Sequence, residues 1–315
     1  MRNSLETLLP LGFLVCLVNS AYSQDLKGDW SVEKAETLLA EFVDLDLELP
    51  EKYGYVLRLN LLTDPGGKQF VEKRIVDNYV RDSAAKVISL TRTIEVVDPL
   101  DGRVLQGEMM QFFKRGSESW FRRNSGEARL PDYELWGKAT QKQQNEVLRF
   151  EPLSLPTFVL WRLVGDPPDE GFLLNTFLEY KPLGVGIRKG KLISHWILKE
   201  ANPNLGHLQT LAFEKDLPVE YTWTMYQGKW NPDEISSLKS LPKKGSLQAK
   251  ISTRWDTKQK LPLEIDGVVS SLSKLSQRVD ASIEWRKDIP EREFATPPSL
   301  VRQQKSVEAP GVGQE

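Results

Sequence analysis

The sequence has 315 residues, with 42 Lys and Arg against 44 Asp and Glu, and therefore a formal net charge of -2. With 40% hydrophobic and 27% charged residues the chain can bury a core, which excludes global disorder. The near-neutral charge argues against a nucleic-acid binder, because such proteins carry an excess of basic residues. Two histidines and one cysteine leave almost no residues for zinc clusters, disulfide frameworks or Cys/His catalysis.

The N-terminus carries the pattern of a signal peptide over residues 1–23. Arg2 precedes an apolar run at residues 8–18, and Ala21 and Ser23 are small residues two apart, the spacing that a signal peptidase reads. The run is too short to cross a bilayer, which needs about 20 residues. We therefore expect an exported protein of the bacterial envelope, periplasmic or extracellular, with no integral membrane segment after cleavage. A short membrane anchor is the alternative.

Residues 26–289 are expected to form a single β domain. An amphipathic helix is predicted at residues 32–43, where apolar residues recur with the 3.6-residue period. The period then changes to two, and strands are predicted at residues 53–61, 70–81, 86–97, 103–114 and 119–124. Their short connections allow only antiparallel neighbours.

A long excursion at residues 126–190 interrupts this pattern. Within it, residues 153–164 are apolar enough for a buried helix with Pro156 in its first turn. Strict alternation then returns in four predicted strands, at residues 219–225, 247–255, 261–265 and 279–285. Such alternation is typical of an antiparallel sheet with one packed and one solvated face. Between two of these strands, Asn231 and Pro232 begin a short predicted helix that reaches Leu241.

Together these elements predict an α+β fold. It consists of an extended, curved antiparallel sheet with two or three amphipathic helices against its apolar face. Residues 290–315 hold four prolines and two glycines, with little apolar periodicity. We expect them to form a mostly disordered tail.

No catalytic motif accompanies the predicted strands. A nucleophile elbow is absent, and the glycines at residues 184–190 have the wrong spacing for a dinucleotide loop. His195 and His207 stand in neighbouring predicted strands, but two histidines without a patterned carboxylate make a poor metal site. The sequence therefore predicts no metal, no cofactor and no enzymatic activity. A hydrolase with two catalytic carboxylates is the weaker alternative, because 44 acids offer no pair with a distinguishable role.

Two features of the apolar face are candidates for ligand binding. Arg92 lies in the apolar phase of residues 86–97, where a cation is costly unless it is paired. It therefore marks either an anion-handling site or a structural ion pair. Three bulky residues, Trp223, Trp255 and Trp285, lie on the apolar phase of their strands. They either line a concavity for an apolar ligand or belong to a packed core.

Two hairpin segments, at residues 211–220 and 253–264, share one pattern. Each has an aromatic–acid pair, a polar turn and a strand that begins Leu-Pro-aliphatic-Glu, where proline costs no ladder hydrogen bond. With the signal-like N-terminus, the leading helix and the closing strand, this pattern resembles the periplasmic lipoprotein-carrier (outer-membrane lipoprotein-sorting) superfamily. It also resembles secreted bacterial proteins related to that family.

The resemblance covers mainly residues 207–294 and, more loosely, residues 31–125. It implies an unclosed β-barrel with helices as a lid, and a non-enzymatic protein that holds acyl chains in an apolar concavity. The expected partner is therefore a lipid or a lipoprotein. A structural or protein-interaction module of the envelope, with helices plugging the concavity, is the alternative.

Overall fold

The protein is described here from a computed structural model. The residues that the structure describes are 49–63, 70–98, 100–126, 135–148, 155–156, 159, 181–187, 191–198, 204–214, 217–230, 235, 241, 245–271 and 276–308. The signal peptide expected at residues 1–23 and the helix expected at residues 32–43 lie outside these ranges. So does most of the helix expected at residues 231–241.

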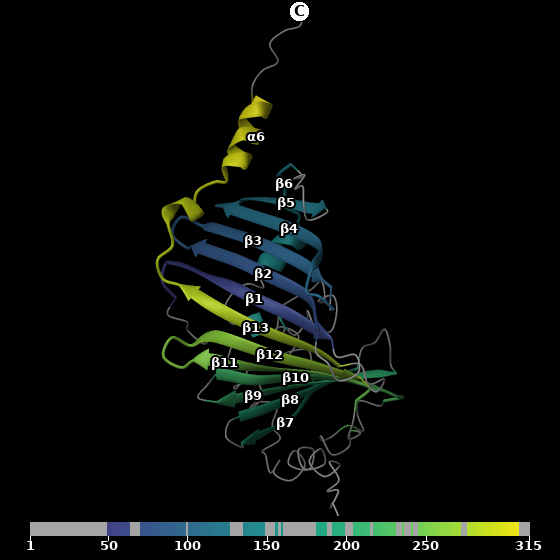
Figure 1. Cartoon of the computed structure of the whole chain (residues 1–315). Coiled ribbons are helices and arrows are strands. Elements are labelled where there is room, and N and C mark those ends of the chain that lie inside the picture. The colour runs from purple at the N-terminus through teal and green to yellow at the C-terminus, as the bar shows by residue number, and fades with distance from the viewer. Residues whose placement is uncertain are drawn as a thin grey trace, which may run out of the picture.

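In the described part of the chain, thirteen antiparallel strands form one sheet, in the order β6-β5-β4-β3-β2-β1-β13-β12-β11-β10-β9-β8-β7. The first meander consists of β1 (Lys52–Thr63), β2 (Phe70–Asp82), β3 (Val87–Val97), β4 (Val104–Arg115), β5 (Glu118–Gly126) and β6 (Gly137–Lys138). The second consists of β7 (Lys181–Ile187), β8 (Lys191–Leu198), β9 (Leu205–Glu214), β10 (Leu217–Gln227), β11 (Leu247–Asp256), β12 (Leu261–Ser271) and β13 (Ser276–Arg286). The two meanders meet where β1 pairs with β13, at the middle of the sheet (Figure 1).

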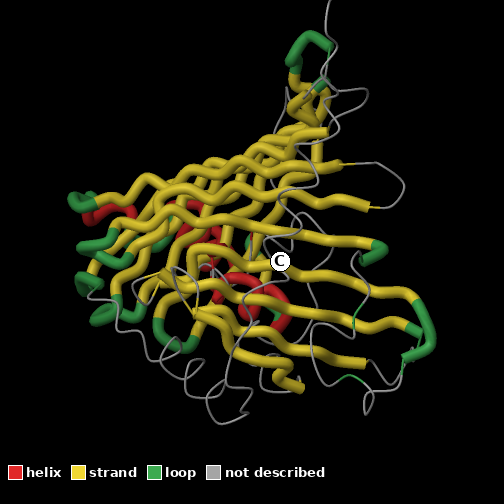
Figure 2. The backbone as a smooth tube through the Cα atoms, turned by 90° about the horizontal axis from the view of Figure 1, so that it is seen from below, coloured by secondary structure: helices red, strands yellow, loops and turns green. Residues whose placement is uncertain are grey.

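The sheet is curved (Figure 2), and β6 and β7 occupy its two ends without pairing in the described part of the chain. This confirms the predicted α+β fold with an unclosed antiparallel sheet. Each strand predicted from alternation is present; most bounds differ by one to three residues, and β12 extends to Ser271 instead of residue 265. The excursion at residues 126–190 also contributes β6 and β7 to the sheet. The β7 segment was not predicted, because a proline and two glycines make it a poor strand former.

The main hydrophobic core lies on one face, which we call the inner face, and joins both meanders. Along β1, Tyr53, Tyr55, Leu57 and Leu59 point to this face and are at most 3% exposed. Ile265 of β12 continues the same core on the other side of the central strand pair. Burying a side chain of this size contributes about 1.5–3 kcal/mol, so the shared core stabilises the junction of the meanders.

Part of the excursion covers the inner face. Helix α3 (Gln141–Leu148) places Val147 in the main core, and Leu155 and Val159 pack into the same core. Leu155, Pro156 and Val159 have helical conformation, as predicted for residues 153–164. The inner face is therefore covered by the described parts of residues 141–159.

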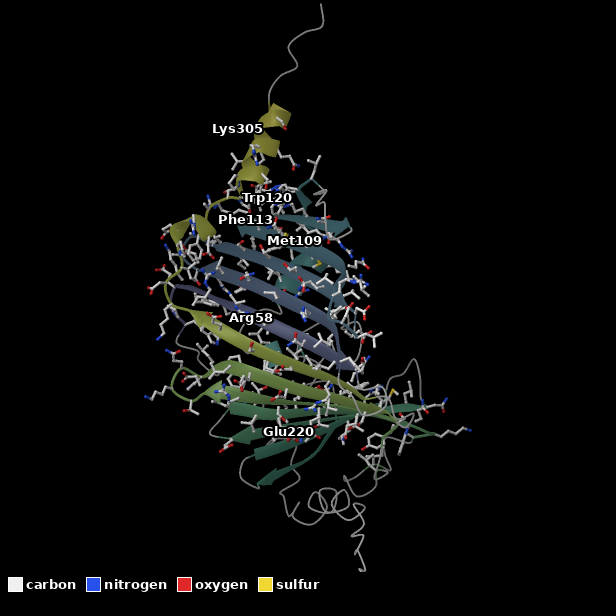
Figure 3. All side chains as sticks on the ribbon, viewed as in Figure 1. Arg58, Met109, Phe113, Trp120, Glu220 and Lys305 are labelled. Atoms are coloured by element: carbon white, nitrogen blue, oxygen red, sulfur yellow. The ribbon has the colours of Figure 1, made fainter. Side chains whose placement is uncertain are left out.

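A second hydrophobic cluster, the outer cluster, lies on the opposite face near β4 to β6. Its buried members are Val80, Val87, Phe113, Trp120, Trp136, Phe294 and Leu300. The last two belong to the segment that we expected to be a mostly disordered tail. Residues 290–308 instead contain the 3-10 helix η5 (Glu291–Glu293) and helix α6 (Pro298–Glu308). Phe294 and Leu300 hold the segment in place because they are buried against residues far away in the sequence. Two isolated apolar residues give no periodic pattern, so the sequence did not predict this order. Figure 3 shows Phe113 and Trp120 at the end of the sheet from which α6 extends.

The rest of the outer face is polar along the middle strands. Arg58 of β1 pairs with Glu284 of β13 at 2.9 Å, and Lys250 of β11 pairs with Glu220 of β10 at 2.6 Å. Exposed ion pairs of this kind contribute about 0–1 kcal/mol each, so they identify the solvent face more than they stabilise it. Among the described residues, no helix is both long and apolar enough to span a membrane.

Candidate ligand-binding site

The candidate site is the part of the inner face that α3 covers. A small hollow remains there, lined by Leu90 and Arg92 of β3, Phe112 of β4 and Phe121 of β5, with Val147 of α3 on the opposite side. Its volume is about 10 Å³, which is room for about one water molecule. In this arrangement α3 fills the site, and the wall beneath it is mostly apolar.

Helix α3 is short and polar, and a local cap begins it. The backbone N–H of Thr140 donates to Gln143 Oε1 at 2.8 Å, and the N–H of Gln143 donates to Thr140 Oγ1 at 3.3 Å. This reciprocal pair is a capping box, which satisfies two N–H groups at the start of the helix. Of the α3 side chains that the structure describes, Val147 is the buried one, at 5% exposed.

Among the α3 side chains that the structure describes, Val147 supplies the buried contact with the sheet. Helices shorter than about 12 residues are marginal on their own, so α3 depends on its cap and on the docking of Val147. Burying one valine contributes about 1.5–3 kcal/mol.

Arg92 lies in the wall of the hollow and is 1% exposed. Its Nε donates to Asp77 Oδ1 at 2.7 Å, and its Nη2 donates to Asp77 Oδ2 at 3.2 Å. Asp77 and Arg92 are register partners on β2 and β3, and Asp77 is completely buried. The structure thus contains the ion pair that the sequence left open, inside the candidate site. Asp77 was not singled out from the sequence, although it occupies the apolar phase of its strand between Ile75 and Tyr79, just as Arg92 does in β3.

The three candidate tryptophans lie further along the sheet. Trp223 of β10 is 9% exposed and stacks on His207 of β9, with ring centroids 5.4 Å apart. Trp255 of β11 donates its indole N–H to a backbone carbonyl at 2.7 Å. Trp285 of β13 lies beside Tyr55, with ring centroids 5.0 Å apart. The structure therefore brings Trp285 to the central strand pair but does not gather the four candidate residues in one place.

Two polar groups interrupt the inner face of the second meander. The hydroxyl of Tyr221 donates to Gln209 Oε1 at 2.5 Å, and both residues are buried. His207 and His195 lie on neighbouring strands, as predicted, but the register pairs His195 with Gln209 and His207 with Ile197. Among the described residues, no group of three or more His, Cys, Asp and Glu is placed to hold a metal ion.

An aromatic group at the junction of the meanders belongs to the same inner face. Tyr79 of β2 stacks on Tyr55 with ring centroids 5.1 Å apart, and it lies 6.1 Å from the ring of Tyr53. With Trp285, these buried tyrosines form an aromatic cluster in the main core, and Tyr79 lies two residues from Asp77 on the same face of β2.

Comparison with solved structures finds several chains that are similar to this one. A LolA superfamily protein from Nitrosomonas europaea is 11% identical, covers 83% of this chain and 97% of its own, and has a TM-score of 0.32. A putative outer membrane lipoprotein-sorting protein domain from Vibrio parahaemolyticus is 9% identical, covers 85% and 96%, and has a TM-score of 0.36. Immune modulator A of Aeromonas veronii is 10% identical, covers 79% and 100%, and has a TM-score of 0.21. Neither models of known protein families nor curated protein sequences match the chain.

Two of these similar structures are a LolA superfamily protein and a putative lipoprotein-sorting domain, the superfamily that the hairpin segments of the sequence resemble.

Proposed function

We propose that the protein is a non-enzymatic carrier that binds a lipid or another amphiphile on the inner face of its sheet, with α3 as a movable cover. The observation that supports this is a contrast between wall and cover. The wall beneath α3 is apolar and aromatic, whereas α3 itself is a polar helix that inserts Val147.

The free energy of burying an acyl chain is large enough to replace that of burying Val147. Withdrawing Val147 from the wall costs about 1.5–3 kcal/mol, and burying one methylene group contributes about 0.8 kcal/mol. About four methylene groups of an acyl chain would therefore offset the loss of Val147. A longer chain that also contacts Leu90, Phe112 and Phe121 would favour the open arrangement.

We propose further that Arg92, Trp223, Trp255 and Trp285 lie along the path of the ligand. Because Asp77 already neutralises Arg92, the wall carries no uncompensated charge there, which suits an uncharged chain. The N-terminal sequence supports export to the bacterial envelope, where a lipid or lipoprotein is the proposed partner.

One observation favours a second function. The hollow beneath α3 holds about one water, and Val147, Leu155 and Val159 are buried in the main core of the inner face. A protein that keeps this arrangement permanently would be a structural or protein-interaction module of the envelope, with a plugged core.

Titration with N-phenyl-1-naphthylamine, an uncharged apolar fluorophore, distinguishes the two functions. Under the carrier proposal the protein binds the probe, and Val147→Ala raises the apparent affinity up to about tenfold, because a weaker cover populates the open state more. Val87→Ala is the matched control, since Val87 is also buried but belongs to the outer cluster. If the protein and both variants bind no probe, the plugged module is the better assignment. Native mass spectrometry of residues 24–315, purified from the envelope without detergent, is an independent measurement. A co-purifying mass in the lipid range would support the carrier and identify its ligand class.

A further inference from the structure

The C-terminal segment forms three hydrogen bonds with one residue at the edge of the sheet, Trp136. The backbone N–H of Trp136 donates to Gln303 Oε1 at 2.8 Å, and Gln303 Nε2 donates to the carbonyl of Trp136 at 2.7 Å. The indole N–H of Trp136 donates to Ser299 Oγ at 3.0 Å. One side-chain amide of α6 therefore makes both hydrogen bonds that a residue on a neighbouring strand would make.

The residues after Trp136 lead directly to the cover. Lys138 in β6 pairs with Trp120 of β5, and its Nζ lies 4.4 Å from the centroid of that ring. The next residue, Ala139, packs against the main core, and its N–H donates to the carbonyl of Ser119 at 2.9 Å. Thr140 then begins α3 through the capping box. The alternation of a strand thus carries the chain from the outer cluster to the inner face within a few residues.

The base of the C-terminal segment is fixed to the middle of the sheet. Glu293 accepts two hydrogen bonds from Arg286 of β13, at 2.5 and 2.6 Å. Arg115 of β4 donates to the carbonyl of Phe294 at 2.9 Å, and Lys52 of β1 pairs with Glu291. The segment is therefore anchored at its start and grips Trp136 further along.

We propose that residues 290–308 form a strap that positions the cover: the grip of α6 on Trp136 fixes β6 and the start of α3, and so sets how readily α3 leaves the inner face. The role of α3 as a cover rests on the proposed function, but the link between α6 and α3 does not. The strap packs on the outer face. It affects α3 on the inner face through Trp136 and β6, which lie at the edge of the sheet.

Hydrogen–deuterium exchange of the full chain tests the link without any ligand. Gln303→Ala removes both backbone bonds to Trp136, and the amides of residues 141–148 are expected to exchange about tenfold faster or more. Ser299→Ala removes the indole bond alone and should give a smaller increase. Gln304→Ala is the matched control, because Gln304 lies on the same helix and is exposed; its exchange should equal that of the unmodified protein.

The proposal fails if Gln303→Ala leaves exchange in residues 141–148 unchanged. It also fails if exchange rises equally throughout the sheet, since that result indicates general destabilisation. Probe titration of the unmodified protein remains a separate test of the proposed function. If Gln303→Ala speeds the exchange of α3 but the unmodified protein binds no probe, the strap proposal is supported and the carrier proposal is contradicted.

Discussion

The indole N–H of Trp255, near the end of β11, donates a hydrogen bond of 2.7 Å to the carbonyl of Pro218 at the start of β10. Two strands further along the sheet, Trp285 near the end of β13 makes the same bond to Pro262 at the start of β12, at 2.8 Å. In both places a tryptophan joins the end of one strand to the proline that begins its neighbour.

Each of these prolines is followed by a bulge. The pairing of β10 with β9 skips Val219, and the pairing of β12 with β11 skips Leu263, so each strand has one extra residue there. Bulges increase the local twist of a sheet, so the repeated bulge contributes to its curvature. The two similar Leu-Pro segments of the sequence are therefore a repeated structural unit.

Replacing either tryptophan by phenylalanine should test this unit. Trp255→Phe and Trp285→Phe each leave a proline carbonyl without its indole donor, and each should lower the free energy of unfolding by about 1–3 kcal/mol. Urea denaturation followed by circular dichroism measures the loss. Unchanged midpoints in both variants would show that the indole bonds contribute nothing.

Breaking the buried ion pair should be more costly. Asp77→Asn leaves the buried guanidinium of Arg92 without its carboxylate, and the expected loss of stability is about 3–5 kcal/mol. The double variant Asp77→Leu with Arg92→Leu removes both charges and should regain most of this loss. Denaturant midpoints of the two variants decide the matter, and a double variant no more stable than Asp77→Asn would contradict the account.

The strap should respond to acid through Glu293. The hydrogen bonds from Arg286 lower the pKa of this carboxyl below its usual value of 4.5. A carboxyl with a lowered pKa stabilises the folded state above its usual pKa, and this contribution is lost as the pH falls through the lowered value. Exchange in residues 290–308 should therefore rise relative to the middle strands as the pH falls below about 4.5. Glu293→Gln removes this titration, and its exchange ratio should vary less over the same range.

A glycine of β1 has no room for a side chain. A methyl group on Gly54 would lie 2.6 Å from the carbonyl oxygen of Tyr79 and 2.9 Å from Ile289 Cδ1, whereas Gly107 of β4 has open space. Gly54→Ala should therefore cost about 1–3 kcal/mol through overpacking. Gly107→Ala is the matched control and should be nearly neutral. Thermal unfolding of both variants measures the difference, and equal melting temperatures would refute it.

The sequence predicted those parts of the fold in which one face is buried and the other solvated. In β11, buried residues alternate strictly with exposed or half-buried ones, so Ala249, Ile251, Thr253 and Trp255 give a clear period of two. Helices α3 and α6 lack such a signal, because tertiary anchors order them: Val147 in α3, and Leu300 with Gln303 in α6.

The candidate site was predicted in part for a related reason. Arg92 was noticed because it stands in an apolar phase, and the same argument applied to β2 would have found Asp77. Which side chains of the excursion cover the inner face depends on contacts between residues far apart in sequence. No local pattern encodes those contacts, so Val147 was not foreseen.

The pairing of β1 with β13 gives the fold an order of assembly. Each meander is built from hairpins between strands that follow one another, so its contacts are local and form early. The seam between them joins residues 54–63 to residues 277–286, and it must wait for the last strand of the sheet. Until then β1 presents an unpaired edge beside apolar residues such as Tyr55 and Leu57, a state prone to aggregation or to exchange of strands between molecules. We therefore expect closure of this seam to be the slow step of folding, and the stage at which a second chain could take the place of β13.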